Sequence, residues 1–168
     1  MKADNIILIG MPGVGKSSVG VVLAKILGYR FLDSDLIIQE EEGKLLHEII
    51  SDEGLDGFIQ VENRVNQSIN CHKSIVATGG SAVYGEEAMA HFKEIGTVVY
   101  LKSDYETISS RLGDLVVRGV AMKEGQTLKE LYEERVPLYE KYADIIVDES
   151  GCRSVRETIS KLLEKINK

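Results

Sequence analysis

The sequence is poor in several residue types: it has no tryptophan, two cysteines, two prolines and three histidines. Cys71 and Cys152 are too few for a disulfide framework or a four-ligand zinc site, so we expect both to be reduced thiols. No apolar run approaches the roughly 18 residues that span a bilayer. Residues 1–5 lead straight into a strand-like run and leave no room for a signal peptide. We therefore expect a cytoplasmic protein without a membrane partner.

The sequence also has no excess of positive charge. The formal net charge is −7 at pH 7, which gives no electrostatic support for a nucleic-acid partner. The apolar fraction of 43% and the charged fraction of 28% are typical of a soluble globular protein. A chain of 168 residues without internal repeats or linkers predicts one domain spanning 1–168, and we expect a monomer.

Short apolar runs alternate with segments of helical periodicity along the whole chain. The runs predict five strands, at 6–9, 29–32, 74–78, 97–101 and 144–147. The periodicity predicts helices at 17–27, 36–42, 45–51, 56–70, 86–93, 105–112, 127–141 and 154–166. This alternation predicts an α/β fold in three layers, a five-stranded parallel sheet with helices on both faces. We expect an acceptor-binding helical region at about 36–70 and an irregular, mobile lid at about 113–125.

A phosphate-binding loop follows the first predicted strand, because residues 10–17 satisfy G-x-x-x-x-G-K-S/T. Its glycines let backbone N–H groups point at phosphates, and the following helix adds its positive end. Lys16 would reach the β- and γ-phosphates as a catalytic residue, and the hydroxyl of Ser17 would bind Mg²⁺. The residues that we assign to the nucleotide in this loop are Gly13, Val14, Gly15, Lys16, Ser17 and Ser18.

The remainder of the chain favours a kinase over other users of such a loop. A GTPase would carry an Asn/Thr-Lys-x-Asp motif that reads the base, and the sequence has none. The apparatus of helicases and motor ATPases is also missing. We therefore predict a compact enzyme that uses ATP and Mg²⁺ to phosphorylate a small hydroxylated metabolite.

Two aspartates end the second predicted strand, on the side of the sheet where the phosphate loop is expected. Asp33 would hold Mg²⁺, and Asp35 would accept a hydrogen bond from the attacking hydroxyl as a catalytic residue. The alternative is that Asp35 or Ser34 caps the next helix, a role that Asp and Ser often take.

These motifs resemble shikimate kinase in order and spacing over nearly the whole chain. The resemblance is carried by the phosphate loop, by 33–35, by Gly79-Gly80 and by the run at 135–139. It implies that the lid residue Arg118 reaches the transferred phosphoryl group as a catalytic residue. It also implies that Arg111 stacks on adenine, and we assign Arg153 to the nucleotide as well.

On the acceptor side, the resemblance implies a set of residues for shikimate: Asp35, Phe58, Gly79, Gly80 and Arg135. Arg135 would pair with the substrate carboxylate. The sequence departs from the family at Ile59, where an arginine that grips this carboxylate is expected, and at Leu55 and Ser81. Losing a charge-assisted pair worth about 2 kcal/mol or more would weaken carboxylate binding at least tens-fold.

Three alternatives to a shikimate kinase remain open from the sequence. The acceptor could be another small alcohol that lacks a carboxylate. The chain could be a catalytically silent nucleotide-binding regulator, although the intact catalytic residues argue against this. A nucleoside monophosphate kinase would need an arginine-rich acceptor site, and the region 40–70 offers only Arg64.

Overall fold

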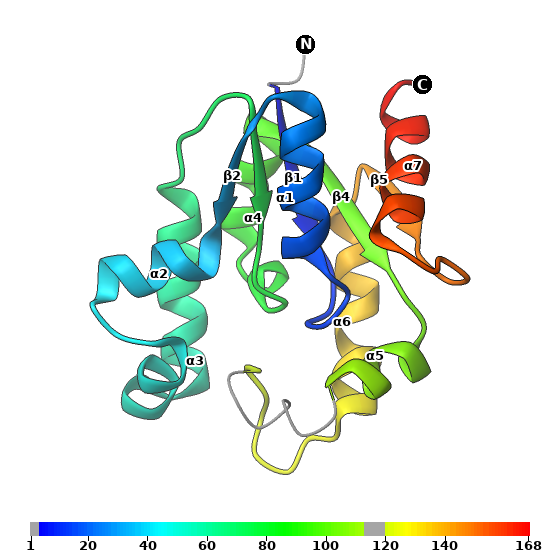
Figure 1. The fold of residues 1–168 in the computed structure, drawn as a ribbon. Coiled ribbons are helices and arrows are strands. Elements are labelled where there is room, and N and C mark those ends of the chain that lie inside the picture. The colour runs from blue at the N-terminus through cyan, green and yellow to red at the C-terminus, as the bar shows by residue number, and fades with distance from the viewer. Residues whose placement is uncertain (1–3, 113–119) are drawn as a thin grey trace.

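The computed structural model describes residues 4–112 and 120–168. Five parallel strands form one sheet in the order β2-β3-β1-β4-β5 (Figure 1). The strands are β1 Asn5–Ile9, β2 Arg30–Asp33, β3 Ser74–Ala77, β4 Gly96–Lys102 and β5 Ile145–Asp148. The central strands are buried on both faces, which is why they read as unbroken apolar runs in the sequence. The predicted α/β fold class is confirmed.

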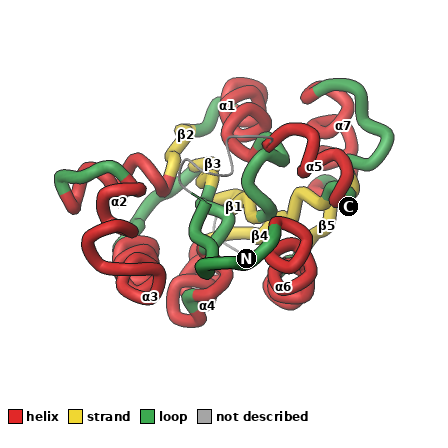
Figure 2. The backbone as a smooth tube through the Cα atoms, turned by 90° about the horizontal axis from the view of Figure 1, so that it is seen from below, coloured by secondary structure: helices red, strands yellow, loops and turns green. Residues whose placement is uncertain are grey.

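Helices cover both faces of this sheet (Figure 2). Helices α1 and α7 pack together on one face, and α4 and α6 lie on the other. The helices are α1 Lys16–Leu27, α2 Ser34–Glu42, α3 Leu46–Gln67, α4 Glu86–Ile95, α5 Tyr105–Leu112, α6 Leu128–Tyr142 and α7 Val155–Ile166, with a 3₁₀ turn at Ala82–Tyr84. Within the described ranges, none of these helices has the length and apolar character needed to span a membrane.

The register of the strands brings three functional loops to one edge of the sheet. Ala77 at the end of β3 is paired with Leu8 in β1 and with Asp33 in β2. Thr78 then donates from its backbone N–H and from its hydroxyl to the carbonyl oxygen of Leu8, at 3.2 and 2.8 Å. The loops that follow β1, β2 and β3 therefore open side by side, where ligands of parallel α/β sheets bind.

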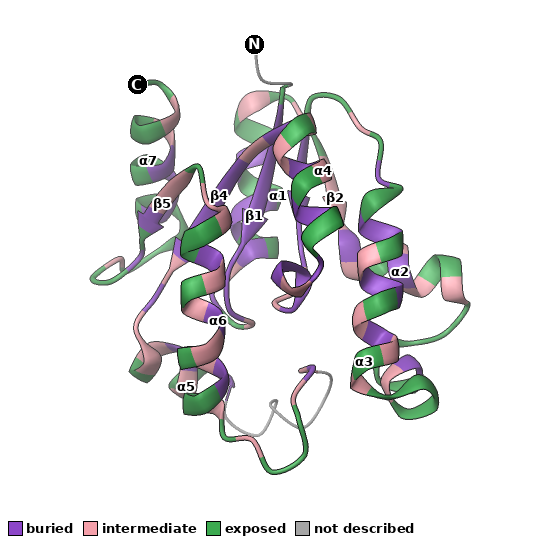
Figure 3. Cartoon of the chain, turned by 180° about the vertical axis from the view of Figure 1, so that it is seen from behind, coloured by how far each residue is buried: buried purple, intermediate pink, exposed green. Residues whose placement is uncertain are grey.

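The core consists of two groups of buried residues. Figure 3 colours the buried residues purple along the sheet and the helices. The larger group lies on both faces of the sheet, and strands β1 and β4 contribute several of its fully buried residues. The smaller joins α2 to α3 through apolar contacts of Ile38, Ile49, Phe58 and Val65. This second group holds the helical region that we expected to bind the acceptor.

Several predicted element boundaries are wrong for local reasons. Helix α2 begins at Ser34 and not at 36, because Asp33 caps it: its Oδ1 accepts from the backbone N–H of Asp35 at 2.9 Å. The two helices predicted at 45–51 and 56–70 are both present within α3: they meet at Gly54, whose φ of 75° and ψ of 174° are not helical, and the second ends at Gln67 instead of 70. Most of the predicted lid, with Arg118, lies outside the described residues.

Candidate active site

The phosphate loop joins β1 to α1, and its glycines adopt backbone angles that other residues avoid. Gly10, Gly13 and Gly15 have φ angles of 151°, 85° and 89°. A Cβ at position 10 would also meet the carbonyl oxygen of Leu101 at 2.7 Å. Helix α1 begins directly after Gly15, so its unpaired N–H groups and the positive end of its dipole face the loop.

Lys16 is the buried cation of this loop, with 8% of its surface exposed. Its Nζ donates to the carbonyl oxygens of Gly10 at 2.7 Å and Met11 at 2.9 Å. Burial lowers the pKa of Lys16 to about 8, the carboxylate of Asp35 opposes this shift, and the charge of Arg135 adds to it. Burial thus disfavours the charged ammonium group, and an anionic ligand bound beside it would stabilise the charge.

Ser17 and Asp33 supply two oxygen atoms that fit Mg²⁺. The hydroxyl of Ser17 donates to Oδ2 of Asp33 at 3.3 Å. Mg²⁺ prefers such oxygen ligands and usually keeps several waters, taking one or two protein groups and substrate phosphates. In the described part of the chain, no group of three or more His, Cys, Asp or Glu side chains could hold a metal by itself. The residues present therefore fit a metal that arrives with a phosphate ligand.

Asp35 lies in the first turn of α2 and lines a cavity together with residues of the phosphate loop. Burial raises the pKa of its carboxyl to about 6, the neighbouring charge of Asp33 raises it further, and Lys16 lowers it. A carboxyl whose pKa lies close to neutral pH is suited to accept a proton from a hydroxyl group. Asp35 therefore has the proton affinity that a general base needs.

The loop after β3 is fixed by aromatic and cationic side chains of α6. Tyr139 donates its hydroxyl to the carbonyl oxygen of Gly80 at 2.6 Å. Arg135 is 1% exposed and donates from Nη2 to the carbonyl oxygen of Ala121 at 2.6 Å. Its guanidinium lies over the ring of Tyr84, 5.4 Å from the ring centroid. A Cβ at Gly80 would approach Nη1 of Arg135 to 2.9 Å, so this loop and the guanidinium are in close contact.

A second buried carboxyl, Glu62 of α3, faces the same loop. Its Oε1 accepts from the hydroxyl of Ser81 at 2.6 Å, and its Oε2 has no hydrogen-bond partner among the described residues. Burial raises the pKa of Glu62 to about 7, against the opposing effect of the hydrogen bond from Ser81. A Cβ at Gly79 would lie 2.7 Å from Oδ1 of Asp35 and 2.9 Å from Oε2 of Glu62. Two carboxyl groups thus converge over Gly79.

The residues expected for the acceptor surround a cavity of about 70 Å³. Its lining includes all five of them: Asp35, Phe58, Gly79, Gly80 and Arg135. Ile59 lines a neighbouring cavity of about 220 Å³ that shares Ala121 with the first. Arg64 is the arginine of the region 40–70, and it donates to Glu42 at the surface. It therefore does not replace the guanidinium that the family has at position 59.

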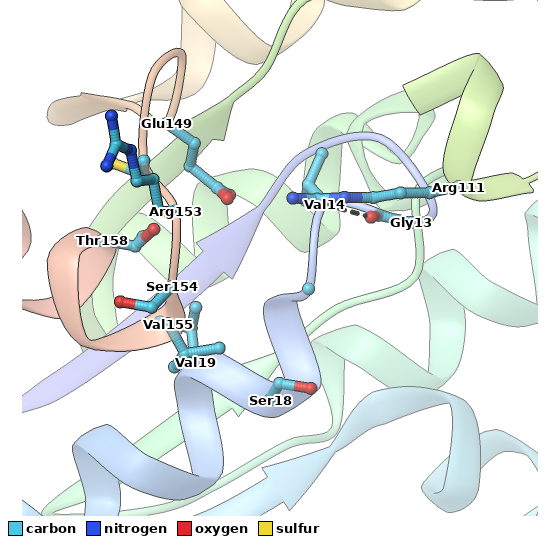
Figure 4. A pocket seen from close by; sticks show the side chains of 12 residues that line it. Gly13, Val14, Ser18, Val19, Arg111, Glu149, Arg153, Ser154, Val155 and Thr158 are labelled. Atoms are coloured by element: carbon cyan, nitrogen blue, oxygen red, sulfur yellow. Dashed lines mark hydrogen bonds between the residues drawn. The ribbon is translucent and has the colours of Figure 1, made fainter. Parts of the chain in front are cut away.

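Most of the residues expected for the nucleotide line a cavity of about 360 Å³ on the other side of the phosphate loop (Figure 4). Six of the eight expected residues line it, namely Gly13, Val14, Gly15, Ser18, Arg111 and Arg153. Lys16 and Ser17 instead line a cavity of about 340 Å³ on the acceptor side of the loop. Arg111 comes from α5 and donates from Nη1 to the carbonyl oxygen of Gly13 at 3.2 Å. Arg153 enters from the loop before α7, so the cavity lies between the two arginines.

Sequence reasoning gave no role to two acids that the structure buries at these cavities. Glu62 stands on the buried face of α3, in register with Phe58 and Val65, and an acid within an apolar stripe was the available signal. Glu149 follows the last residue of β5 and lines the nucleotide cavity. Its position at the carboxyl end of a parallel strand was the signal there.

Comparisons with known proteins agree with the resemblance seen in the sequence. The family model described as shikimate kinase matches residues 12–167. A shikimate kinase of Persephonella marina is 36% identical over 96% of this chain and 98% of its own length. A shikimate kinase of Thermodesulfovibrio yellowstonii is 36% identical over 97% of this chain and 96% of its own length.

A solved structure gives the same result. The shikimate kinase of Acinetobacter baumannii in complex with shikimate superposes with a TM-score of 0.86 at 33% identity, covering 98% of this chain and 93% of the other. The matches extend over nearly the full length on both sides, so they include the phosphate loop as well as the acceptor cavity. The chain therefore belongs to the shikimate kinase family, whose members are phosphotransferases with an alcohol as acceptor.

Proposed function

We propose that this chain transfers the γ-phosphoryl group of ATP to a hydroxyl group of shikimate, with Mg²⁺ as cofactor. One observation carries the proposal: a cavity of about 340 Å³ is lined both by the phosphate loop and by the acceptor residues Asp35, Gly79 and Gly80. Lys16 and Ser17 belong to the same lining. A phosphate bound by the loop and a hydroxyl bound near Asp35 would share this space.

Each side chain then has a task that its surroundings support. Asp35 orients the acceptor hydroxyl and takes its proton, which its raised pKa favours. Lys16 leaves the loop carbonyls and donates to the phosphate oxygens, where negative charge spreads during transfer. When bound at Ser17 and Asp33, Mg²⁺ offsets the charge of the phosphates. Catalysis of this kind depends mainly on positioning and electrostatics.

The acceptor side supports shikimate through the charge of Arg135. This buried guanidinium donates to neutral oxygen atoms of Ala121 and Tyr84, so its positive charge remains to attract a substrate carboxylate. The family relative from A. baumannii was solved in complex with shikimate, which supports the same acceptor for this chain. The apolar Ile59 removes one expected cation, so we expect shikimate binding that is weaker than in relatives with an arginine there.

We also propose that the enzyme acts as a monomer. The two cysteines are free, which supports a reducing compartment such as the cytoplasm.

The test is the steady-state release of ADP by the purified protein with ATP and Mg²⁺, with and without shikimate. We expect a saturable rate that depends on shikimate and is abolished by Lys16→Ala. Lys25→Ala is the matched control, because Lys25 lies exposed on the same helix and should leave the rate unchanged. A protein that binds ATP but shows no stimulation at millimolar shikimate would contradict the proposed acceptor.

A further inference from the structure

Glu149 is an acid that the proposed phosphoryl transfer does not use. It follows β5, and its backbone is fixed on both sides: its N–H donates to the carbonyl oxygen of Lys102 at 2.8 Å, and its own carbonyl oxygen accepts from Cys152 at 2.8 Å. The side chain is directed into the nucleotide cavity, and the residue is 8% exposed. Figure 4 shows its carboxyl group pointing into the space between Arg153 on one side and Arg111 on the other.

One oxygen of this carboxyl lacks a partner in the described part of the chain. Oε1 of Glu149 is buried and has no hydrogen bond within 4–112 and 120–168. A buried polar atom without a partner is unfavourable, so a ligand that supplies a donor would gain affinity. Phosphate oxygens cannot be that partner, because they are acceptors that carry negative charge. The donor must come from the other end of the nucleotide.

The surroundings of Glu149 favour the base over the ribose. Val14, Val19 and Val155 give the cavity an apolar surface that suits a flat ring. The edge of adenine carries an amino group that donates and a ring nitrogen that accepts. A neutral carboxyl group matches this pair, because its C=O accepts and its O–H donates. Ribose offers hydroxyl groups but no such paired edge.

The charges around Glu149 allow the neutral form. Burial raises its pKa to about 7, the positive charges of Arg111 and Lys16 lower it, and Asp148 raises it. Arg153 is a further cation on the cavity wall. Near neutral pH the carboxyl is thus able to donate as well as accept.

We propose that Glu149 reads the amino-bearing edge of adenine and so selects the base of the nucleotide. This inference rests on the proposed use of ATP. It adds a specificity-determining residue on the nucleotide side of the site, whereas the acceptor is chosen by residues of the other cavity.

The experiment compares the binding of ATP with that of purine riboside triphosphate, which lacks the amino group. Dissociation constants are measured by calorimetry at pH 6.5 with Mg²⁺ for the wild-type protein, Glu149→Gln and Glu149→Leu. The matched control is Glu140→Leu, which changes an exposed acid paired with Lys102 on the surface. Thermal unfolding of every variant checks the fold.

We expect the wild-type protein to prefer ATP by about three- to tenfold, the equivalent of one net hydrogen bond. Glu149→Gln should keep the preference, because an amide also accepts and donates to this edge of adenine. Glu149→Leu should bind both nucleotides equally, and Glu140→Leu should behave as the wild type does.

An unchanged preference in Glu149→Leu would overturn the inference. A folded Glu149→Leu that instead loses discrimination between ATP and 2′-deoxy-ATP would also overturn it, because Glu149 would then contact the ribose. Release of ADP with shikimate, measured on the same proteins, separates the two proposals. If the wild type turns over ATP with shikimate but shows no preference for the amino group, the inference alone fails. A wild type that binds neither nucleotide would overturn both.

Discussion

Ile59 stands where an arginine would add a positive charge beside the acceptor cavity. Ile59 lines the cavity next to Arg135, and the two cavities meet at Ala121. We predict that Ile59→Arg lowers the KM for shikimate about tenfold or more, because a hydrogen bond between charged groups contributes about 1.5–3 kcal/mol. Steady-state kinetics over a range of shikimate concentrations measures the effect. Ile59→Leu is the control without a charge. An equal KM in the arginine and leucine variants would contradict this role for position 59.

Gly79 leaves room for the carboxyl groups of Asp35 and Glu62, because it has no side chain. A methyl group there would lie 2.7 Å from Oδ1 of Asp35 and 2.9 Å from Oε2 of Glu62, so at least one carboxyl would have to move. We predict that Gly79→Ala lowers kcat/KM for shikimate by about a hundredfold, the size expected when a catalytic group is displaced by about 1 Å. The affinity for ATP, measured by calorimetry on the same variant, should stay unchanged. A variant with wild-type kinetics would show that the two carboxyls have room to shift.

At the scale of elements, the bend in α3 decides where its first turns lie. Gly54 has φ 75° and ψ 174°, a conformation that only glycine adopts readily. The segment before the bend carries Leu46, which lines the acceptor cavity. We predict that Gly54→Ala destabilises the protein by about 1–3 kcal/mol and raises the KM for shikimate.

The stability change is measured by thermal unfolding, in which about 1 kcal/mol lowers the Tm of a protein of this size by roughly 2–4 °C. Ser51→Ala, at an exposed position of the same segment, is the control. A Gly54→Ala variant with an unchanged Tm would mean that α3 straightens or bends elsewhere without cost.

The sequence predicted the elements and the loops of the site well, and the reasons are local. The apolar run at 6–9 and the glycines of 10–15 each encode their structure within a few residues. The start of α2 was wrong because the same carboxylate, that of Asp33, both ends a strand and caps a helix. The break predicted between two helices is confirmed at Gly54, whose backbone angles are not helical, because a glycine between two periodic segments is a local signal.

The buried acids were harder to predict because their burial depends on distant parts of the chain. Glu62 is covered by the loop after β3, and its hydrogen bond comes from Ser81. Glu149 lines a cavity together with Arg111 of α5 and with the phosphate loop, which lies more than a hundred residues earlier in the sequence. A carboxylate in a sequence is usually exposed, so only the assembled fold shows that these two are not.

For the whole molecule, buried carboxyls make stability depend on pH. Burial raises the pKa of Glu62 and Glu149 to about 7 and that of Asp35 to about 6. The folded protein therefore holds protons that the unfolded chain releases, and its free energy of unfolding falls as the pH rises from about 4.5 to 7. We predict that the Tm of the ligand-free protein is higher at pH 5 than at pH 8.

Glu62→Gln isolates one contribution to this trend. The amide keeps an oxygen for the hydroxyl of Ser81 and cannot ionise. We predict that it stabilises the protein by about 1–3 kcal/mol at pH 8 and by much less at pH 5, because a shift of one pKa unit corresponds to about 1.4 kcal/mol. Thermal unfolding at both pH values measures the difference. A Tm that falls as steeply in the variant as in the wild type would contradict this assignment.

The start of β1 and the end of α7 lie at the edge of the sheet opposite the site (Figure 1). Strand β1 starts there, α7 finishes there, and the phosphate loop opens at the far end of the same strand. A fusion partner, an affinity tag or a surface tether can therefore be joined to either end without standing in the path of substrates. Because the site lies at the opposite edge of the sheet, this enzyme can be linked in tandem with a second enzyme near the start of β1 or near the end of α7.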